Sequence, residues 1–140
     1  MDINTKEIQY DTKGEADIID ITEDIQNLVT KSRVKDGQVT VFIPGSTASL
    51  TTVEYEKGLV KDLKGLFERI APKNIRYAHD EAWHDGNGHS HIRASLLGPS
   101  LTIPFSGGGL ILGTWQQIIL VDFDNRPRKR KVVVQVIGNR

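Results

Sequence analysis

The feature that most constrains the fold is a change of pattern at Pro72. Before this residue, apolar side chains recur at every third or fourth position across residues 58–70, which is the spacing of one face of an α-helix. After it, short runs rich in β-branched residues are separated by turn residues, as in strands. The expected strands are residues 75–78, 101–105, 110–112, 116–123 and 132–137. Helices combined with many antiparallel strands predict an α+β fold.

The residues before this helix add further strands and a second main helix. Residues 3–10 and 16–21 are expected to form short strands around a turn, and residues 39–43 a third strand rich in β-branched residues. Thr22 is placed to cap a helix, and the two acidic residues that follow it suit the positive end of the helix dipole. No repeat or low-complexity linker divides the chain, so we expect one domain over residues 1–140.

Charge and cysteine content exclude several classes of function. Lysine plus arginine and aspartate plus glutamate are equal, at 18 each, so no global field attracts nucleic acid or a lipid surface. The chain has no cysteine, which excludes disulfides, thiolate metal sites and cysteine nucleophiles. Its first residues lack the pattern of a signal peptide, and no apolar stretch approaches the roughly 20 residues that cross a bilayer. We expect a cytoplasmic protein without nucleic-acid or membrane partners.

All four histidines of the chain lie in one segment, residues 79–91. The low apolar content of residues 80–91 predicts a long functional loop rather than a core element. If His89 and His91 flank Ser90 in an extended chain, their imidazoles point to the same side, roughly 6.5 Å apart at Cα, and can reach one ion. His79, at the end of an expected strand, could close the site. Three imidazoles with an open fourth position suit a catalytic divalent metal such as zinc.

Acidic and amide side chains accompany these histidines. Asp85 or Glu54 could supply a carboxylate ligand or orient a ligating imidazole, and Asn87 adds an amide. His84 is set aside because its neighbour Trp83 suggests packing. Two alternatives remain open. The imidazoles could bind a phosphate or act as general acid and base, or they could be ordinary surface histidines.

Two other segments carry candidate binding groups. Ser46 and Thr47 follow a strand and, together with backbone N–H groups, could form an anion-binding nest, although an ordinary turn is the alternative. Trp115 and Gln116 could stack on and hydrogen-bond a heterocycle, but the indole suits a protein core equally well.

The one basic run, residues 126–131, is expected to be a solvated hairpin tip. Alternatively, Arg128 and Arg130 could bind a phosphate, in this chain's site or in that of a neighbouring subunit. Three consecutive glycines at residues 107–109 are expected to form a hairpin turn.

Four stretches of the sequence resemble the YjbQ-like family. They are residues 41–48, 85–95, 97–101 and 112–117, which read VFIPGSTA, DGNGHSHIRAS, LGPSL and LGTWQQ. Members of this family are described as secondary thiamine-phosphate synthase enzymes or as uncharacterised proteins. The resemblance implies an α+β fold with a mixed, largely antiparallel β-sandwich, assembled as a homotrimer.

The resemblance also implies a site for a divalent metal or an anion around the histidines. The matching positions are His79, Asp85, Asn87, His89 and His91, with Ser46, Thr47 and Glu54 nearby. One departure is visible in the loop after the third expected strand. Many members have His-Thr-Thr-Ala where this chain has Gly45 followed by Ser-Thr-Ala.

Three functional hypotheses follow. The first is an enzyme that joins a pyrimidine diphosphate to a thiazole phosphate, with zinc or magnesium neutralising the leaving diphosphate. The second is a metal-assisted hydrolase of a small phosphorylated metabolite, and the third is a non-catalytic trimeric protein that binds a metal or a metabolite. The candidate catalytic residues are Asp85, Glu54 and Asn87, and the candidate substrate-binding residues are Ser46, Thr47, Trp115, Gln116, Arg128 and Arg130.

Overall fold

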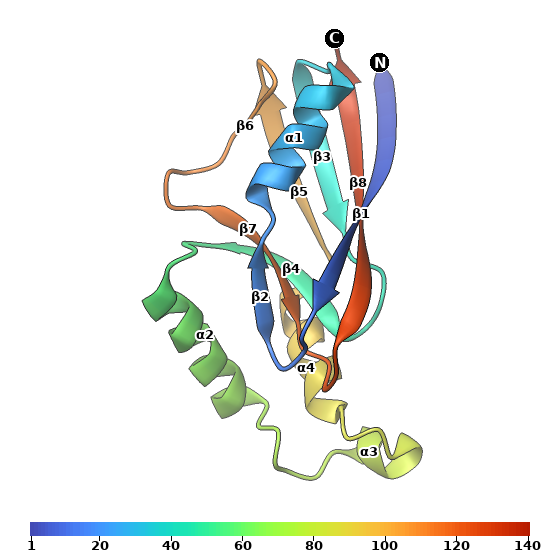
Figure 1. The fold of residues 1–140 in the computed structure, drawn as a ribbon, viewed down its shortest axis with the longest axis vertical. Helices are drawn as coiled ribbons and strands as arrows, with labels where there is room; N and C mark the ends of the chain where they lie inside the picture. Colours follow the sequence, from blue (N-terminus) through green and yellow to red (C-terminus); the bar gives the residue numbers. More distant parts are fainter.

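The computed structural model describes residues 1–140, and its strands form two sheets (Figure 1). The five-stranded sheet has the order β1-β8-β3-β5-β6, the three-stranded sheet has the order β2-β7-β4, and every pairing is antiparallel. The strands are β1 (Asp2–Thr12), β2 (Asp17–Asp20), β3 (Asp36–Phe42), β4 (Ala48–Val53), β5 (Ser100–Ser106), β6 (Gly109–Leu110), β7 (Gln117–Asp122) and β8 (Arg128–Asn139). The predicted α+β class with antiparallel sheets is confirmed.

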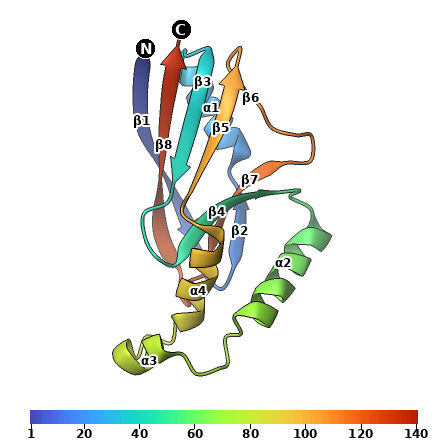
Figure 2. The ribbon, with the colours of Figure 1, turned by 180° about the vertical axis from the view of Figure 1, so that it is seen from behind.

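Four helices complete the fold, whereas the sequence predicted two main ones. They are α1 (Thr22–Ser32), α2 (Lys57–Ile70), α3 (Ala78–Trp83) and α4 (Gly88–Leu97). Helix α1 packs on the five-stranded sheet, whereas α2 and α4 lie beside the three-stranded sheet (Figure 1, Figure 2). None of the helices is long and apolar enough to cross a membrane.

The core has two parts because β7, the central strand of the smaller sheet, is buried on both faces. Ile118 and Leu120 face the larger core, which also contains side chains of α1, β3 and β8. Ile119 and Val121 point the other way, into a smaller cluster that includes Phe67 of α2. Strand side chains alternate between the two faces, so this uninterrupted apolar run is the sequence pattern of a doubly covered strand.

The helix predicted at residues 58–70 is confirmed as α2, which begins at Lys57. Glu56 caps it, because its carboxylate accepts hydrogen bonds from the N–H groups of Gly58 and Leu59. Phe67 is the one buried residue of the helix and packs edge-on against Phe123, with 4.7 Å between the ring centroids. Helix α2 is therefore held along a narrow line of contact.

The prediction for residues 75–91 is wrong in two respects. No strand forms at residues 75–78, and the expected loop at residues 80–91 consists mainly of α3 and the first turn of α4. In α4, Ser90, Arg93 and Ala94 are buried at the three- and four-residue spacing of a helix face. His89 and His91 lie in the first turn of α4, and the apolar residues of this helix come later, so the polar segment by itself did not show the pattern of a helix.

Three further details differ from expectation near the ends of strands. β1 and β2 are not hairpin partners, since β1 pairs with β8 and β2 with β7, so the turn between them carries the chain from one sheet to the other. Thr22 does not cap α1. The N–H of Thr22 donates a hydrogen bond to Asp20, and the hydroxyl of Thr22 accepts one from the N–H of Ile118. β4 was not predicted, because half of its residues are serine or threonine. The Gly107–Gly108 turn between β5 and β6 is as predicted.

Candidate functional site

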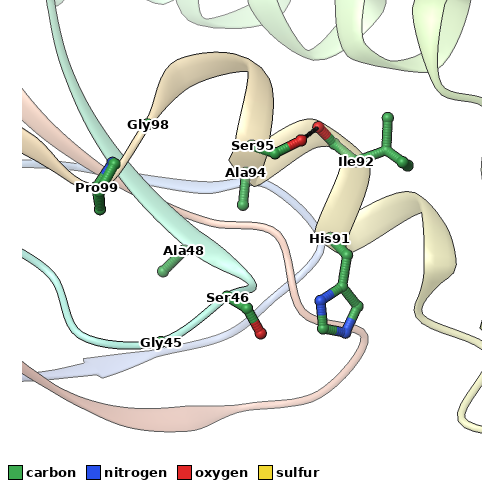
Figure 3. A pocket seen from close by; sticks show the side chains of 9 residues that line it. All are labelled: Gly45, Ser46, Ala48, His91, Ile92, Ala94, Ser95, Gly98 and Pro99. Atoms are coloured by element: carbon green, nitrogen blue, oxygen red, sulfur yellow. Dashed lines mark hydrogen bonds between the residues drawn. The ribbon is translucent and has the colours of Figure 1, made fainter.

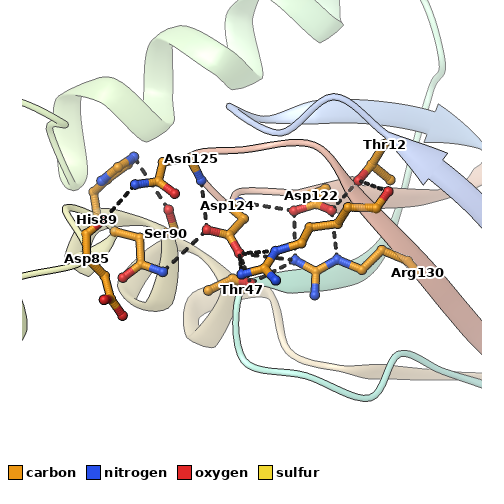
Figure 4. A network of polar contacts seen from close by, with 11 residues as sticks. Thr12, Thr47, Asp85, His89, Ser90, Asp122, Asp124, Asn125 and Arg130 are labelled. Atoms are coloured by element: carbon orange, nitrogen blue, oxygen red, sulfur yellow. Dashed lines mark hydrogen bonds and ion pairs between the residues drawn. The ribbon is translucent and has the colours of Figure 1, made fainter. Parts of the chain in front are cut away.

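A cluster of buried charges lies where β7 ends and β8 begins (Figure 4). Asp122 and Asp124 have no exposed surface. The Arg130 guanidinium makes two parallel contacts to Asp122, from Nε to Oδ2 at 2.7 Å and from Nη2 to Oδ1 at 2.9 Å. Arg128 contacts Oδ2 of Asp124 through Nε at 2.8 Å and Nη2 at 2.6 Å. Two acids and two arginines therefore compensate one another where solvent is largely excluded.

Asp124 also joins separate segments of the chain. Its Oδ2 accepts a hydrogen bond from the Thr47 hydroxyl at 3.1 Å, and its Oδ1 accepts one from the Asn87 amide at 3.3 Å. Burial by itself raises the pKa of this carboxyl, but the N–H of Asn125, the Arg128 guanidinium and the Asn87 amide outweigh burial and lower the pKa from 3.8 to about 2. Asp124 therefore stays ionised and ties the loop at Thr47 to the start of α4.

The sequence interpretation missed Asp122, Asp124 and Thr12, whose hydroxyl donates to Asp122. The available signal was Asp-Phe-Asp at the end of a strongly apolar strand, followed closely by arginines. Acids that end a buried strand need partners of opposite charge, and the arginines of the next strand are the nearest ones. The basic run at residues 126–131 is accordingly not a fully solvated tip, since the side chain of Arg130 is only 11% exposed.

The extended conformation expected for residues 89–91 is wrong, because all three residues lie in α4. Successive residues of a helix are turned by about 100°, so side chains two positions apart point in nearly opposite directions. His89 is fully buried, its Nε2 lies 3.5 Å from a carboxylate oxygen of Glu15, and its Nδ1 has no hydrogen-bond partner. His89 therefore lies in the interior, away from His91.

His91 instead meets His79, and the centroids of the two imidazole rings are 4.3 Å apart. Burial and the neighbouring His79 lower the pKa of His91 below its usual value of 6.5, against the opposing effect of three nearby aspartates. His91 is therefore neutral at pH 7, the form in which an imidazole nitrogen binds a metal or accepts a proton. Nδ1 of His79 is buried and has no hydrogen-bond partner.

Two cavities flank the first turn of α4. One, of about 580 Å³, lies between α4 and the loop before β4 (Figure 3), and is lined by Gly45, Ser46, Ala48, His91, Ile92, Ala94, Ser95, Gly98 and Pro99. The other, of about 200 Å³, is wholly polar and is lined by Asp85, Asn87, Asn125, Arg126 and Arg128. His91, which lines the first cavity, and Asn87, which lines the second, are one helical turn apart. The imidazole, amide and guanidinium groups of the two cavities suit a ligand with an anionic group.

Most of the candidate residues gather around these cavities, but four do not: the buried His89 and three residues farther away. The gathered residues are Ser46, Thr47, His79, Asp85, Asn87, His91, Arg128 and Arg130. Glu54, Trp115 and Gln116 lie at the opposite end of the smaller sheet, and the six residues of β4 between the two ends span about 17 Å. Trp115 is also not a core residue, since it is 72% exposed.

Comparison with known proteins identifies the family to which this chain belongs. A family model described as UPF0047 protein YjbQ-like matches residues 6–139. The chain belongs to the YjbQ-like family. A UPF0047 protein of Archaeoglobus fulgidus is 37% identical to it over 131 residues, which cover 94% of this chain and 99% of that protein. The UPF0047 protein YugU of Bacillus subtilis is 30% identical, over 95% of this chain and 98% of that protein.

Solved structures share the YjbQ-like fold. A YbjQ-like protein of unknown function from Sulfolobus solfataricus superposes with a TM-score of 0.93 at 30% identity, covering 99% of each chain. A hypothetical protein from Aeropyrum pernix has a TM-score of 0.90 at 27% identity, covering 97% of this chain and 99% of that chain. The resemblance seen in four stretches of sequence is thus confirmed over nearly the whole chain.

In this YjbQ-like protein, the metal ligands predicted from the sequence do not converge. No group of three or more histidine, aspartate or glutamate side chains could hold one ion, and His89 faces away from the other two imidazoles. His79 and His91 remain as a pair, and the unpartnered buried atoms beside them are Nδ1 of His79 and Oδ1 of Asn87. Imidazole nitrogen and amide oxygen both bind divalent metals, so by their chemistry these are the residues of this region that could contribute ligands, with the other positions left to water or to a bound molecule.

Proposed function

We propose that this protein is a cytoplasmic, metal-dependent enzyme that acts on a small phosphorylated metabolite at the first turn of α4. The observation that carries the proposal is the convergence of three groups around two adjacent cavities: the neutral His91 imidazole at one, and the Asn87 amide and the Arg128 guanidinium at the other. Such a combination of metal ligands and guanidinium groups is what a metal-bound phosphate requires.

The residues of the polar cavity are suited to hold the phosphate. Arg126 and Arg128 can donate to its oxygens, and Arg128 is oriented for this by the ionised Asp124 behind it. His79 and His91 would hold a zinc ion, which supplies neutralisation of phosphate charge when it is bound. Magnesium, which prefers oxygen ligands, would instead enter with the diphosphate of the substrate.

Thiamine-phosphate synthesis is the reaction to test first. A pyrimidine diphosphate loses diphosphate from its methylene carbon, and the ring nitrogen of a thiazole phosphate forms the new C–N bond. Negative charge grows on the departing oxygen, next to Arg126 and Arg128, which stabilise it.

The assay combines both phosphorylated precursors with purified protein and either zinc or magnesium, and detects the product by mass spectrometry. The variants Arg128→Gln and His91→Ala should lose most of the product. The reaction is ruled out if high protein concentrations yield no product with either metal.

Hydrolysis of one phosphorylated compound is the second candidate, and the position of three residues favours it. Three of the expected site residues, Glu54, Trp115 and Gln116, lie at the far end of β4, a strand about 17 Å long that begins after the loop of Ser46 and Thr47. A hydrolase needs only water as the acceptor, with Asp85 of the polar cavity as base. Release of phosphate from a panel of phosphoesters, without any thiazole, separates this reaction from the synthase.

We also infer a homotrimer. Several large apolar side chains are more than half exposed in the single chain, among them Trp83, Leu96, Ile111 and Trp115. Apolar surface of this kind is commonly buried between subunits. Sedimentation velocity measures the mass directly, and a monomeric mass at micromolar protein concentration would contradict the inference.

A further inference from the structure

One nitrogen of the Arg130 guanidinium has no partner in the chain. Nε and Nη2 donate to Asp122, and Nη2 also donates to the Thr47 hydroxyl at 2.7 Å. These bonds leave Nη1 free (Figure 4). Nη1 has no hydrogen-bond partner, and it is accessible to solvent. A guanidinium that is 11% exposed and held by three hydrogen bonds thus presents one donor group in a fixed position.

Gly45 provides the space in front of this nitrogen. A Cβ built on Gly45 would lie 3.2 Å from Nη1 of Arg130. An anionic oxygen that accepts a hydrogen bond from a guanidinium nitrogen lies about 2.7–2.9 Å from it, so the Cβ and the oxygen would compete for one place. The φ angle of Gly45 is +121°, a conformation that residues with a side chain rarely adopt. Glycine at this position therefore keeps the gap open.

The surroundings of the gap are basic. Arg130 lines a cavity of about 330 Å³ together with Pro44, Lys129 and Lys131, where Glu7 is the one acid. Gly45 and the next residue line the pocket beside α4. The gap thus lies where residues of the α4 pocket and of this basic cavity meet, and the arginine that faces it is distinct from Arg128 in the polar cavity.

We propose that the gap over Gly45 is an anion subsite in which a phosphate group accepts a hydrogen bond from Nη1 of Arg130. Gly45 makes phosphate binding possible there, because a side chain at this position would occupy the place of the phosphate oxygen. The inference rests on the proposed function and deepens it, because it assigns a second position for phosphate in the same site. The backbone N–H groups and the hydroxyl of the Gly45-Ser46 loop are further donors at this position. The ligand class is a small molecule with a phosphate dianion.

The test measures binding of inorganic phosphate to the full chain by isothermal titration calorimetry, for the wild type, Gly45→Ala and Gly107→Ala. Gly107 also has a positive φ, +58°, but nothing lies within 4 Å of a Cβ built on it. Gly107→Ala therefore adds backbone strain without touching Arg130. We expect Gly45→Ala to weaken phosphate binding at least about tenfold, since a charge-assisted hydrogen bond is blocked, and Gly107→Ala to stay within about twofold.

A second measurement needs no variant. Titration of the 15N-labelled wild type with phosphate should shift the amide signals of Gly45 and Ser46 with the dissociation constant found by calorimetry, and leave that of Gly107 in place. The proposal is overturned if the wild type binds no phosphate, if Gly45→Ala binds as tightly as the wild type, or if the Gly45 amide does not respond.

These outcomes are independent of the enzyme assays. Phosphate binding that depends on Gly45 without any turnover would keep the subsite and reject the proposed reactions. If the protein turns over substrate but Gly45→Ala does not change its affinity for phosphate, the proposed reaction is kept and the subsite is rejected.

Discussion

The two ends of the three-stranded sheet differ in the kind of side chain that they carry and in how deeply those side chains are buried. The charged end consists of Asp122, Asp124, Arg128 and Arg130, and the indole end consists of Tyr55, Trp115 and Gln116. The charged end buries two carboxylates completely, whereas the indole end leaves a tryptophan 72% exposed. Buried ion pairs contribute little net stability because desolvation offsets their attraction, and exposed apolar surface marks places of association. The charged end is thus organised to orient binding groups, and the indole end to meet another surface.

Asp122→Ala should have the largest effect of any change in this comparison. The variant leaves the Arg130 guanidinium buried without its carboxylate, so we expect the free energy of unfolding to fall by about 3–5 kcal/mol. Urea unfolding followed by circular dichroism measures this loss. Asp62→Ala, at an exposed position of α2, is the matched control and should stay within about 0.5 kcal/mol of the wild type. Equal stabilities of the two variants would contradict the distinction between the ends.

The pH dependence of stability should come from the same end of the sheet. The pKa of Asp124 is about 2 in the folded chain and 3.8 without its partners. A lowered pKa contributes stability that is complete above pH 4 and is lost as the pH falls toward 2. Asp124→Asn removes this titration, so the stability difference between wild type and variant should shrink by roughly 2 kcal/mol between pH 5 and pH 2. A difference that stays constant over this range would show that Asp124 does not act in this way.

The next effect concerns the imidazole pair beside the charged end. His79→Ala should raise the pKa of His91, because it removes the neighbouring imidazole and lets solvent approach. NMR titration of the metal-free protein measures this pKa. His84→Ala is the control, since His84 ends α3 outside the pair and should leave the pKa of His91 unchanged. Identical titration curves for all three proteins would mean that the two rings do not interact in solution.

The two ends also differ in how far the sequence predicts them. Chemistry was predictable at the charged end, where Asn87, His79, His91 and Arg128 all lie near the cavities. Geometry was not, because the sequence of residues 79–91 does not reveal that a helix begins at Gly88 and turns His89 away from His91. Local pattern predicts which residues are polar, but only tertiary packing decides which of them meet.

Long-range pairing explains most of what the sequence left open. Helix α2 was predictable from its own spacing, since the signal lies within one segment. Asp122 was not recognised as a site residue because its partners Thr12 and Arg130 come from β1 and β8. These two strands pair with each other although they lie at opposite ends of the sequence. β4 was missed because it is defined by its pairing with β7 more than by its own residues.

Trp115→Ala, at the indole end, should have the smallest effect on the stability of the single chain. It therefore tests whether this end serves association rather than folding. The indole is 72% exposed and belongs to neither hydrophobic core cluster, so the free energy of unfolding at dilute protein concentration should change by less than about 0.5 kcal/mol. Assembly should respond instead, because the exposed ring is available to a neighbouring subunit. Sedimentation velocity of the variant is expected to show a shift toward smaller species, with Gln38→Ala on the five-stranded sheet as the control. A large loss of stability together with unchanged assembly would contradict the assignment of the indole end to association.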